Sequence, residues 1–284
     1  MKLIRFGEEE KERTGILLED KLIDVSAFVD DYNEAFFKND GINKLKELVE
    51  SKRTSLPQVP AGIRLGSPVA RPSKIVCIGL NYADHARETG ATPPPEPVIF
   101  LKSTTALTGP FDHIMIPLSS KKTDWEVELG VVIGKKASYV EEEDALNYVA
   151  GYVLHNDVSE REFQIERSGT WDKGKGCDTF APMGPWLVTP DEIADIDHLR
   201  LWLRVNGQTM QDGTTANLIF NIPFLVAYTS RFMTLLPGDV ISTGTPAGVG
   251  MGMKPQVYLK EGDVVELGID GLGMARQNVV AFKK

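Results

Sequence analysis

The chain has 284 residues, of which 42% are apolar, and it carries a formal net charge of -9. This length favours one large domain with a smaller one attached to it. The acidic balance excludes nucleic acid and anionic membrane surfaces as expected partners, because both require a basic protein surface.

The N-terminal segment gives no sign of export. MKLIRFGEEEKER lacks the apolar centre of a signal peptide, and no run of about 18 apolar residues follows it. We therefore expect a cytoplasmic protein. The two cysteines, Cys77 and Cys177, are far apart and form no CxxC pair, so we expect neither a disulfide framework nor a thiolate zinc site.

The first 70 residues predict a small α/β domain. Three strands are expected at Met1–Phe6, Thr14–Leu18 and Lys21–Val25, followed by a helix over Gly41–Ser51. The segment from Thr54 to Pro72 is rich in proline and glycine, which interrupt regular structure. We interpret it as a linker that separates a domain of residues 1–70 from one of residues 71–284.

Beyond the linker, short β-branched runs predict strands, and helical patterns are few. The expected strands are Lys74–Gly79, Val98–Leu101, Glu128–Ile133, Ala150–Leu154, Leu199–Val205, Val240–Ser242 and Val264–Ile269. The expected helices are Tyr82–Glu88, Val158–Glu166 and Ile222–Phe232. Asn206-Gly207 predicts a hairpin turn leading into Gln208–Gln211. This balance predicts a mostly β protein with short helices, in a rolled or closed sheet.

Two glutamates lie two residues apart in a predicted strand. Glu126 and Glu128 therefore project from the same face, with Cα atoms roughly 6.5 to 7 Å apart. An ExE pattern can also be an exposed polar strand face. Here, however, the run Leu129–Ile133 is apolar on both faces, as in a strand buried on two sides. Buried carboxylates need partners, because an unpaired buried charge is costly.

A third carboxylate, Asp157, follows the strand that ends at Leu154. It could be an ordinary helix N-cap or the third ligand of a metal ion. Three oxygen ligands without His or Cys suit Mg²⁺ or Mn²⁺ better than Zn²⁺. Three carboxylates around a divalent cation leave about one negative charge, so an anionic substrate needs nearby cations, and Arg161, Lys173 and Lys175 are candidates.

A strand followed by a short helix carries His85 and Glu88, one helical turn apart. This spacing lets the carboxylate orient the imidazole as a general base, although an exposed histidine on a charged helix face is the alternative. His155 could support the metal site or be a buried structural histidine. The glycine-rich stretches lack both nucleotide-binding motifs, GxxxxGK[ST] and strand-GxGxxG-helix, so we exclude nucleotide binding.

Several separated blocks together resemble the fumarylacetoacetate hydrolase family over about residues 71 to 284. The blocks are Ile78–His85, Phe100–Lys102, Asp124–Gly134, Gly151–Gln164, Lys175–Pro185 and Ile241–Gly250. The resemblance implies a mixed β-roll catalytic domain that holds the metal, commonly in a homodimer.

The resemblance also implies roles for individual residues of this chain. The metal ligands are then Glu126, Glu128 and Asp157, and the water-activating pair is His85 and Glu88. Lys175 belongs to the catalytic group, and the expected substrate contacts are Lys102, Arg161, Gln164 and Thr245.

The activity implied is Mg²⁺-dependent hydrolysis of a C–C bond in a 2,4-dioxo acid, with Mn²⁺ as a possible substitute. The substrate would be a small anionic acylpyruvate or 2,4-diketo-3-deoxy sugar acid, cleaved through a pyruvate enolate. The same enolate chemistry also serves isomerases, tautomerases and decarboxylases acting on an oxo-diacid, such as 2-hydroxyhepta-2,4-diene-1,7-dioate or oxaloacetate. The alternative outside the enzymes is a non-catalytic protein that binds metal-chelated oxo acids.

Overall fold

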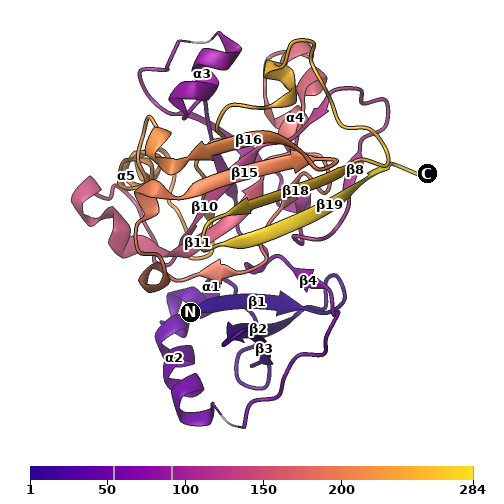
Figure 1. The fold of residues 1–284 in the computed structure, drawn as a ribbon. Coiled ribbons are helices and arrows are strands. Elements are labelled where there is room, and N and C mark those ends of the chain that lie inside the picture. The colour runs from indigo at the N-terminus through magenta and orange to yellow at the C-terminus, as the bar shows by residue number, and fades with distance from the viewer. Residues whose placement is uncertain (54, 91, 284) are drawn as a thin grey trace.

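The computed structural model describes residues 1–53, 55–90 and 92–283, and for Thr89 the backbone alone. Thr54, where the predicted linker begins, and Lys284, where the predicted second domain ends, lie outside these residues. Strands dominate the chain (Figure 1), which confirms the prediction of a mostly β protein with short helices. No helix among the described residues has the length and apolar character needed to cross a membrane.

The N-terminal part is an antiparallel meander with two helices beside it (Figure 1). Its elements are β1 (Lys2–Phe6), β2 (Arg13–Leu18), β3 (Lys21–Asp24), α1 (Glu34–Lys38) and α2 (Gly41–Lys52). Glu19 and Asp20 connect β2 to β3 with positive φ angles of 47° and 62°, a backbone that suits a two-residue hairpin turn. The strands and the second helix lie where the sequence predicts them.

The segment predicted as a linker is partly regular. Strand β4 (Leu65–Gly66) pairs with β1, which corrects the prediction of an irregular stretch there. Arg64, next to it, binds Asp112 at 2.6 and 2.8 Å and Glu12 at 2.8 Å. These tertiary contacts hold the chain extended, so a segment poor in local signals still forms a strand. The boundary at residue 70 stays a prediction.

The larger sheet runs from the N-terminal meander into the body of the protein. Its order is β3-β2-β1-β14-β11-β10-β17-β5-β6. The further members are β14 (Leu187–Val188), β11 (Val149–Asn156), β10 (Val127–Ile133), β17 (Val240–Ser242), β5 (Ile75–Gly79) and β6 (Val98–Lys102). Strands β17 and β5 are parallel and the other neighbours antiparallel, so the sheet is mixed.

A second sheet of five strands lies across β10 and β11 (Figure 1). Its order is β16 (Gln208–Thr214), β15 (Arg200–Val205), β18 (Val264–Ile269), β19 (Gly273–Ala281) and β8 (Ile114–Ile116). The predicted hairpin at Asn206-Gly207 joins β15 to β16. Both sheets are open over the described residues. Of the two forms expected from the sequence, a rolled or a closed sheet, this part of the chain does not show closure into one barrel.

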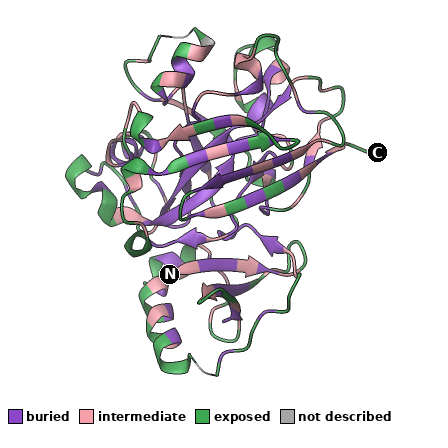
Figure 2. Cartoon of the chain, viewed as in Figure 1, coloured by how far each residue is buried: buried purple, intermediate pink, exposed green. Residues whose placement is uncertain are grey.

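The core lies between the two sheets, where Figure 2 shows mostly buried residues. Every residue of β10 is buried, which confirms the prediction of a strand covered on both faces. The remaining two-stranded pairings are β9 (Thr123–Asp124) with β12 (Ser159–Glu160) and β7 (Leu107–Thr108) with β13 (Ala181–Pro182).

The helices of the larger part are short. They are α3 (Ala83–Thr89), α4 (Asp172–Lys175) and α5 (Ile222–Phe232), with 3-10 turns at Thr104–Ala106, Glu142–Tyr148, Pro190–Glu192, Ile196–His198, Thr215–Asn217 and Gly250–Gly252. The predicted helix at Ile222–Phe232 is confirmed, and that at Tyr82–Glu88 is found shifted by one residue, as α3.

The predicted helix over Val158–Glu166 is wrong. The chain forms the short strand β12 and then one π-helical stretch over Glu162–Glu166. Ser159 pairs with Asp124, and the buried Glu160 carboxylate accepts hydrogen bonds from Ser120 and from the Lys122 amide. These long-range partners outweigh a modest local helix preference.

Candidate active site

Three buried carboxylates meet where strands β10 and β11 pair. Glu126 precedes β10, Glu128 lies within it, and Asp157 directly follows β11. The Asp157 amide donates to the Glu126 carbonyl at 2.9 Å, so the antiparallel pairing places Asp157 beside Glu126. One carboxylate oxygen from each residue lies within 4.8 Å of the others. The structure therefore brings together the predicted ligand set, with 5%, 2% and 0% of these residues exposed.

Cationic side chains reach two of the three carboxylates. Lys175 Nζ lies 2.7 Å from Glu126 Oε2 and 2.9 Å from Asp157 Oδ2, and Lys102 Nζ lies 2.5 Å from Asp157 Oδ1. Arg161 donates to Glu126 Oε1 at 2.6 Å and to Asp124 Oδ2 at 2.8 Å. Glu128 has no such ion pair among the described residues.

This asymmetry separates the pKa values of the carboxyl groups. Burial, with the charges of Asp157 and Glu126, raises the pKa of Glu128 well above its usual value. Burial also acts on Glu126, but Lys175 and Arg161 lower its pKa below the usual value. Burial is likewise outweighed at Asp157, where Lys102 and Lys175 lower the pKa. Glu128 is thus the carboxylate that most requires a further positive charge.

The donor set fits a hard divalent cation. The site contains four carboxylates, namely the three of the cluster and Asp124, and three cationic side chains, those of Lys102, Arg161 and Lys175. Their charges sum to one net negative charge. A divalent cation would change this to one net positive charge and would neutralise Glu128. Oxygen-only ligands suit Mg²⁺ or Mn²⁺. Sequence reasoning missed Asp124, although it continues the alternation of Glu126 and Glu128 by two residues.

Glu128 is held by a hydrogen-bonded chain that starts at a buried histidine. Ser242 Oγ donates to Glu128 Oε2 at 2.5 Å and lies 2.6 Å from His155 Nδ1. Because the hydroxyl proton goes to Glu128, the imidazole must donate its Nδ1–H to Ser242. Burial lowers the pKa of His155 to about 3, so the ring is neutral. His155 is therefore a buried histidine that is linked to the carboxylate cluster through Ser242, and its support of a metal site stays a prediction.

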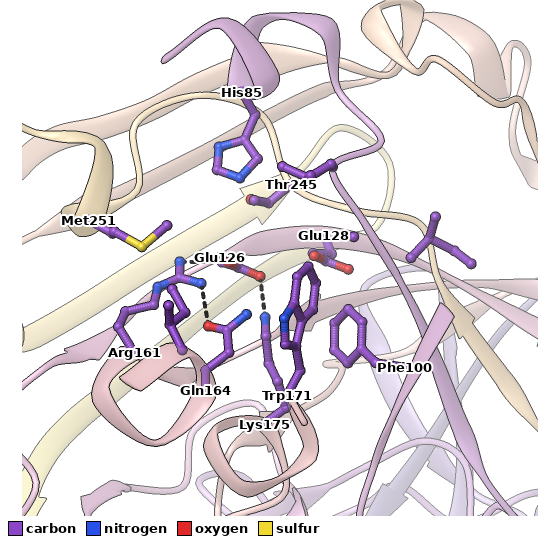
Figure 3. Close-up of a pocket in the computed structure, with 14 residues that line it drawn as sticks. His85, Phe100, Glu126, Glu128, Arg161, Gln164, Trp171, Lys175, Thr245 and Met251 are labelled. Atoms are coloured by element: carbon purple, nitrogen blue, oxygen red, sulfur yellow. Dashed lines mark hydrogen bonds and ion pairs between the residues drawn. The ribbon is translucent and has the colours of Figure 1, made fainter. Parts of the chain in front are cut away.

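His85 lies across the cavity from Lys175 (Figure 3) and pairs with a glutamate of the same helix. In α3, His85 Nδ1 lies 3.5 Å from Glu88 Oε2. Glu88 also accepts the Gly248 amide at 3.0 Å. Burial raises the pKa of Glu88, but the contacts with His85 and Gly248 outweigh it and lower the pKa below the usual value. The ionised carboxylate is thus suited to orient the imidazole.

A glycine-rich loop fixes Glu88. A Cβ on Gly248, where φ is +108°, would lie 1.9 Å from the Met210 carbonyl oxygen, so only glycine can present its amide there. A Cβ on Gly252 would lie 2.5 Å from Glu88 Cδ. The sequence identified this stretch as part of the family resemblance and Thr245 as a substrate contact, but it assigned no role to Gly248 or Gly252.

The cavity between these groups has a volume of about 210 Å³. Its polar lining consists of His85, Glu126, Glu128, Arg161, Gln164, Lys175 and Thr245. Gln164 Oε1 accepts from Arg161 Nη1 at 3.1 Å. Thr245 donates to the Val127 carbonyl at 2.9 Å and accepts from Gln211 at 2.8 Å, so its hydroxyl proton is already used.

The predicted residue Lys102 lies apart from this lining. Its ammonium binds Asp157 and the Val158 carbonyl, and the residue does not line the cavity. Lys173 is on the surface, where it donates to the Arg167 carbonyl. Lys175 instead reaches the cluster because α4 packs closely against the backbone of Glu160. A Cβ on Gly174 would lie 2.5 Å from the Glu160 carbonyl oxygen, so glycine is needed there.

The fold agrees with that of known proteins. A family model described as Fumarylacetoacetate (FAA) hydrolase C-terminal matches residues 74–280, and the chain belongs to this family. A Burkholderia multivorans protein with the provisional name of hydrolase is 54% identical to this chain over 96% of each sequence.

Three solved structures show how functions differ among similar folds. Fumarylacetoacetate hydrolase from Exiguobacterium antarcticum is 34% identical, with a TM-score of 0.85 over 99% of this chain and 100% of that one. Maleylpyruvate hydrolase from Sphingobium sp. SYK-6, solved with manganese(II) and pyruvate, is 30% identical, with a TM-score of 0.82 over 100% of both chains. The delta-isomerase of 5-carboxymethyl-2-hydroxymuconate from Mycobacterium smegmatis is 34% identical, with a TM-score of 0.78 over 100% of both.

These comparisons confirm the family and the fold that the sequence predicts. Together with the hydrolase names of the relatives, they support an enzyme of the hydrolase type. The roles of the individual site residues stay predictions, and so do the cytoplasmic location and the homodimer.

Proposed function

We propose that this protein hydrolyses a C–C bond in a small 2,4-dioxo acid. The observation that carries the proposal is the position of His85, paired with Glu88, across one cavity from the carboxylates Glu126 and Glu128 (Figure 3). A base on one side and a site for a cation on the other are the two requirements for adding water to a polarised carbonyl. The manganese and pyruvate bound by the Sphingobium relative support the same assignment.

Glu126, Glu128 and Asp157 would hold Mg²⁺ or Mn²⁺. When bound, this ion supplies Lewis-acid stabilisation of the negative charge on the substrate oxygens. Arg161, Gln164 and Lys175 line the cavity and offer N–H donors to the substrate carboxylate.

The chain's own residues would then carry the proton transfers. His85, oriented by Glu88, takes a proton from water, and the resulting hydroxide adds to the carbonyl carbon at position 4. The bond between carbons 3 and 4 breaks, and its electron pair moves onto carbon 3 to give pyruvate enolate. Protonation of carbon 3 yields pyruvate, and the other product is the acid of the former acyl group.

The similarity to the delta-isomerase supports a second candidate, in which an oxo-diacid is isomerised or decarboxylated without water attack. The two reactions use His85 differently. A His85 substitution is expected to abolish hydrolysis but to spare decarboxylation.

A turnover screen distinguishes the candidates. The Mg²⁺- and Mn²⁺-loaded protein would be incubated with acetylpyruvate, oxaloacetate, a 2,4-diketo-3-deoxy sugar acid and 2-hydroxyhepta-2,4-diene-1,7-dioate, and the products identified by NMR. We expect acetate and pyruvate from acetylpyruvate. An isomerised or decarboxylated diacid as the sole product would support the second candidate, and tight binding without turnover would indicate a non-catalytic binder.

A further inference from the structure

The two ends of the cavity differ in chemistry. One end carries the carboxylates and the cationic groups Arg161 and Lys175. The other is formed by the aromatic rings of Phe100 and Trp171 (Figure 3). Ile165 and Met251 are further apolar residues of the lining. A substrate held by its acid group at the polar end must place its remaining chain against apolar side chains.

The aromatic end is built into the fold. Phe100 and Trp171 meet edge to face, with ring centroids 5.2 Å apart. Gly79 permits the contact with β5, because a Cβ there would lie 2.5 Å from Trp171 Cζ3. Lys175 Nζ lies 4.9 Å from the centroid of the Phe100 ring, so the apolar wall begins directly beside the ammonium group.

Both cations that line the cavity lie at the carboxylate cluster. Lys175 contacts Glu126 and Asp157, and Arg161 contacts Glu126 and Asp124. Among the residues that the structure describes, no other lysine or arginine lines the cavity. A second carboxylate at the far end of a substrate would therefore find apolar groups and no cation.

The net charge of the cluster leads to the same conclusion. With a divalent cation bound, the cluster carries one positive charge, which a substrate with a single carboxylate neutralises. A dicarboxylate would leave one uncompensated negative charge in a buried site, and the nearby Glu88 carboxylate adds to the repulsion.

We propose that the site selects 2,4-dioxo acids with one carboxylate and an uncharged apolar tail, and that Phe100 and Trp171 determine this specificity. The inference rests on the proposed function, since it assumes that the acid group binds at the metal end. It separates this chain's substrate class from the compounds with two or three carboxylates that the names of similar proteins contain, such as maleylpyruvate and 5-carboxymethyl-2-hydroxymuconate.

A matched pair of substrates tests the proposal. Butanoylpyruvate and succinylpyruvate have the same chain, except that a terminal methyl group in one is a carboxylate in the other. We expect kcat/KM of the Mg²⁺-loaded protein to be about 100-fold higher for butanoylpyruvate, because only succinylpyruvate buries an unpaired charge. Equal values, or a preference for succinylpyruvate, would overturn the proposal and leave the hydrolase assignment intact.

Variants connect the preference to the apolar wall. Trp171→Ala is expected to lower kcat/KM for butanoylpyruvate about 10-fold while changing that for acetylpyruvate, which has no extended tail, much less. Ile165→Arg adds a cation at a lining residue that is 53% exposed, and it should reduce the preference for butanoylpyruvate about 10-fold. Ile165→Gln, which is polar but uncharged, is the matched control and should keep the preference.

A binding measurement keeps the proposal testable even without turnover. 2-Oxohexanoate and 2-oxoadipate differ in the same way as the substrate pair and contain no cleavable 4-carbonyl group. Calorimetry with the Mn²⁺-loaded protein should show tighter binding of 2-oxohexanoate. If no substrate is hydrolysed but 2-oxohexanoate still binds more tightly, the proposed function is refuted and the specificity is supported. Tighter binding of 2-oxoadipate would overturn the specificity.

Discussion

Ser242 donates its hydroxyl proton to Glu128 Oε2 over 2.5 Å, within the buried junction of β17 and β10. Glu128 is the carboxylate of the triad that no lysine or arginine contacts among the described residues. Its orientation therefore depends on neutral donors, namely Ser242 and the Gly244 amide at 3.1 Å. Residues that orient a metal ligand in this way influence affinity for the ion.

Ser242→Ala is expected to weaken binding of Mg²⁺ or Mn²⁺ about 10- to 100-fold, because the Glu128 carboxylate loses its orienting donor. Calorimetric titration of the metal-free protein measures the change. Thr243→Val is the matched control: the Thr243 hydroxyl is buried next to Ser242 and has no hydrogen-bond partner in the described structure. An unchanged dissociation constant for Ser242→Ala would contradict the role of Ser242.

Metal removal is expected to lower thermal stability near neutral pH, because a cation that binds only the folded state stabilises it. At a free concentration of about 100 times Kd, the stabilisation is about 2.7 kcal/mol. A thermal melt with EDTA and with added Mg²⁺ or Mn²⁺ measures it. Glu128→Gln should be insensitive to the added ion, and a wild-type melting temperature that EDTA does not change would argue against the metal site.

Glu88→Ala is expected to lower kcat about 100-fold, because His85 loses the carboxylate that orients it. The measurement is turnover of acetylpyruvate with saturating metal. Arg87→Ala changes an exposed residue on the same helix and should leave kcat within about twofold. Wild-type turnover by Glu88→Ala would remove the pair from the mechanism.

Gly252→Ala tests the position of the same Glu88 carboxylate by crowding it. The new Cβ would lie 2.5 Å from Glu88 Cδ, so the carboxylate must move and kcat should fall about 10-fold. A double-mutant cycle gives the control: in a Glu88→Ala background, Gly252→Ala should have almost no further effect, because the side chain that it displaces is absent. If the kcat losses of the two single variants multiplied in the double variant, Gly252 would act independently of Glu88.

The ion pair between Arg64 and Asp112 should make stability depend on pH. Burial raises the pKa of Asp112, but Arg64, Thr108 and the Gly109 amide outweigh it and lower the pKa below its usual 3.8. A carboxyl group with a lowered pKa in the folded state stabilises the protein above its unfolded pKa. This contribution is lost as the pH falls through the folded value.

Asp112→Asn should therefore cost about 1.5 kcal/mol at pH 7, and the difference from wild type should shrink as the pH falls below about 4. Urea unfolding between pH 7 and pH 3 measures both quantities. Glu9→Gln, at an exposed position, should show no such trend. A difference that stays constant down to pH 3 would exclude the ion pair as its origin.

Local patterns determined much of this protein. The period-2 spacing of Glu126 and Glu128, the two-sided apolar run after them, the Asn206-Gly207 hairpin and the helix Ile222–Phe232 all appear in the structure as predicted. These features depend on the backbone geometry of a few successive residues, which the sequence encodes directly. The separated family motifs likewise identified the family, which the comparisons confirm.

Only the tertiary structure decided which distant residues meet. Pairing between Ser159 and Asp124 replaced the predicted helix after Asp157 with a strand, and Asp124 joined the cluster through Arg161. The link from His155 through Ser242 and the meeting of Phe100 with Trp171 join residues that lie 87 and 71 positions apart. Such contacts depend on the order and register of strands, because neighbouring strands bring together residues whose separation along the chain carries no local signal.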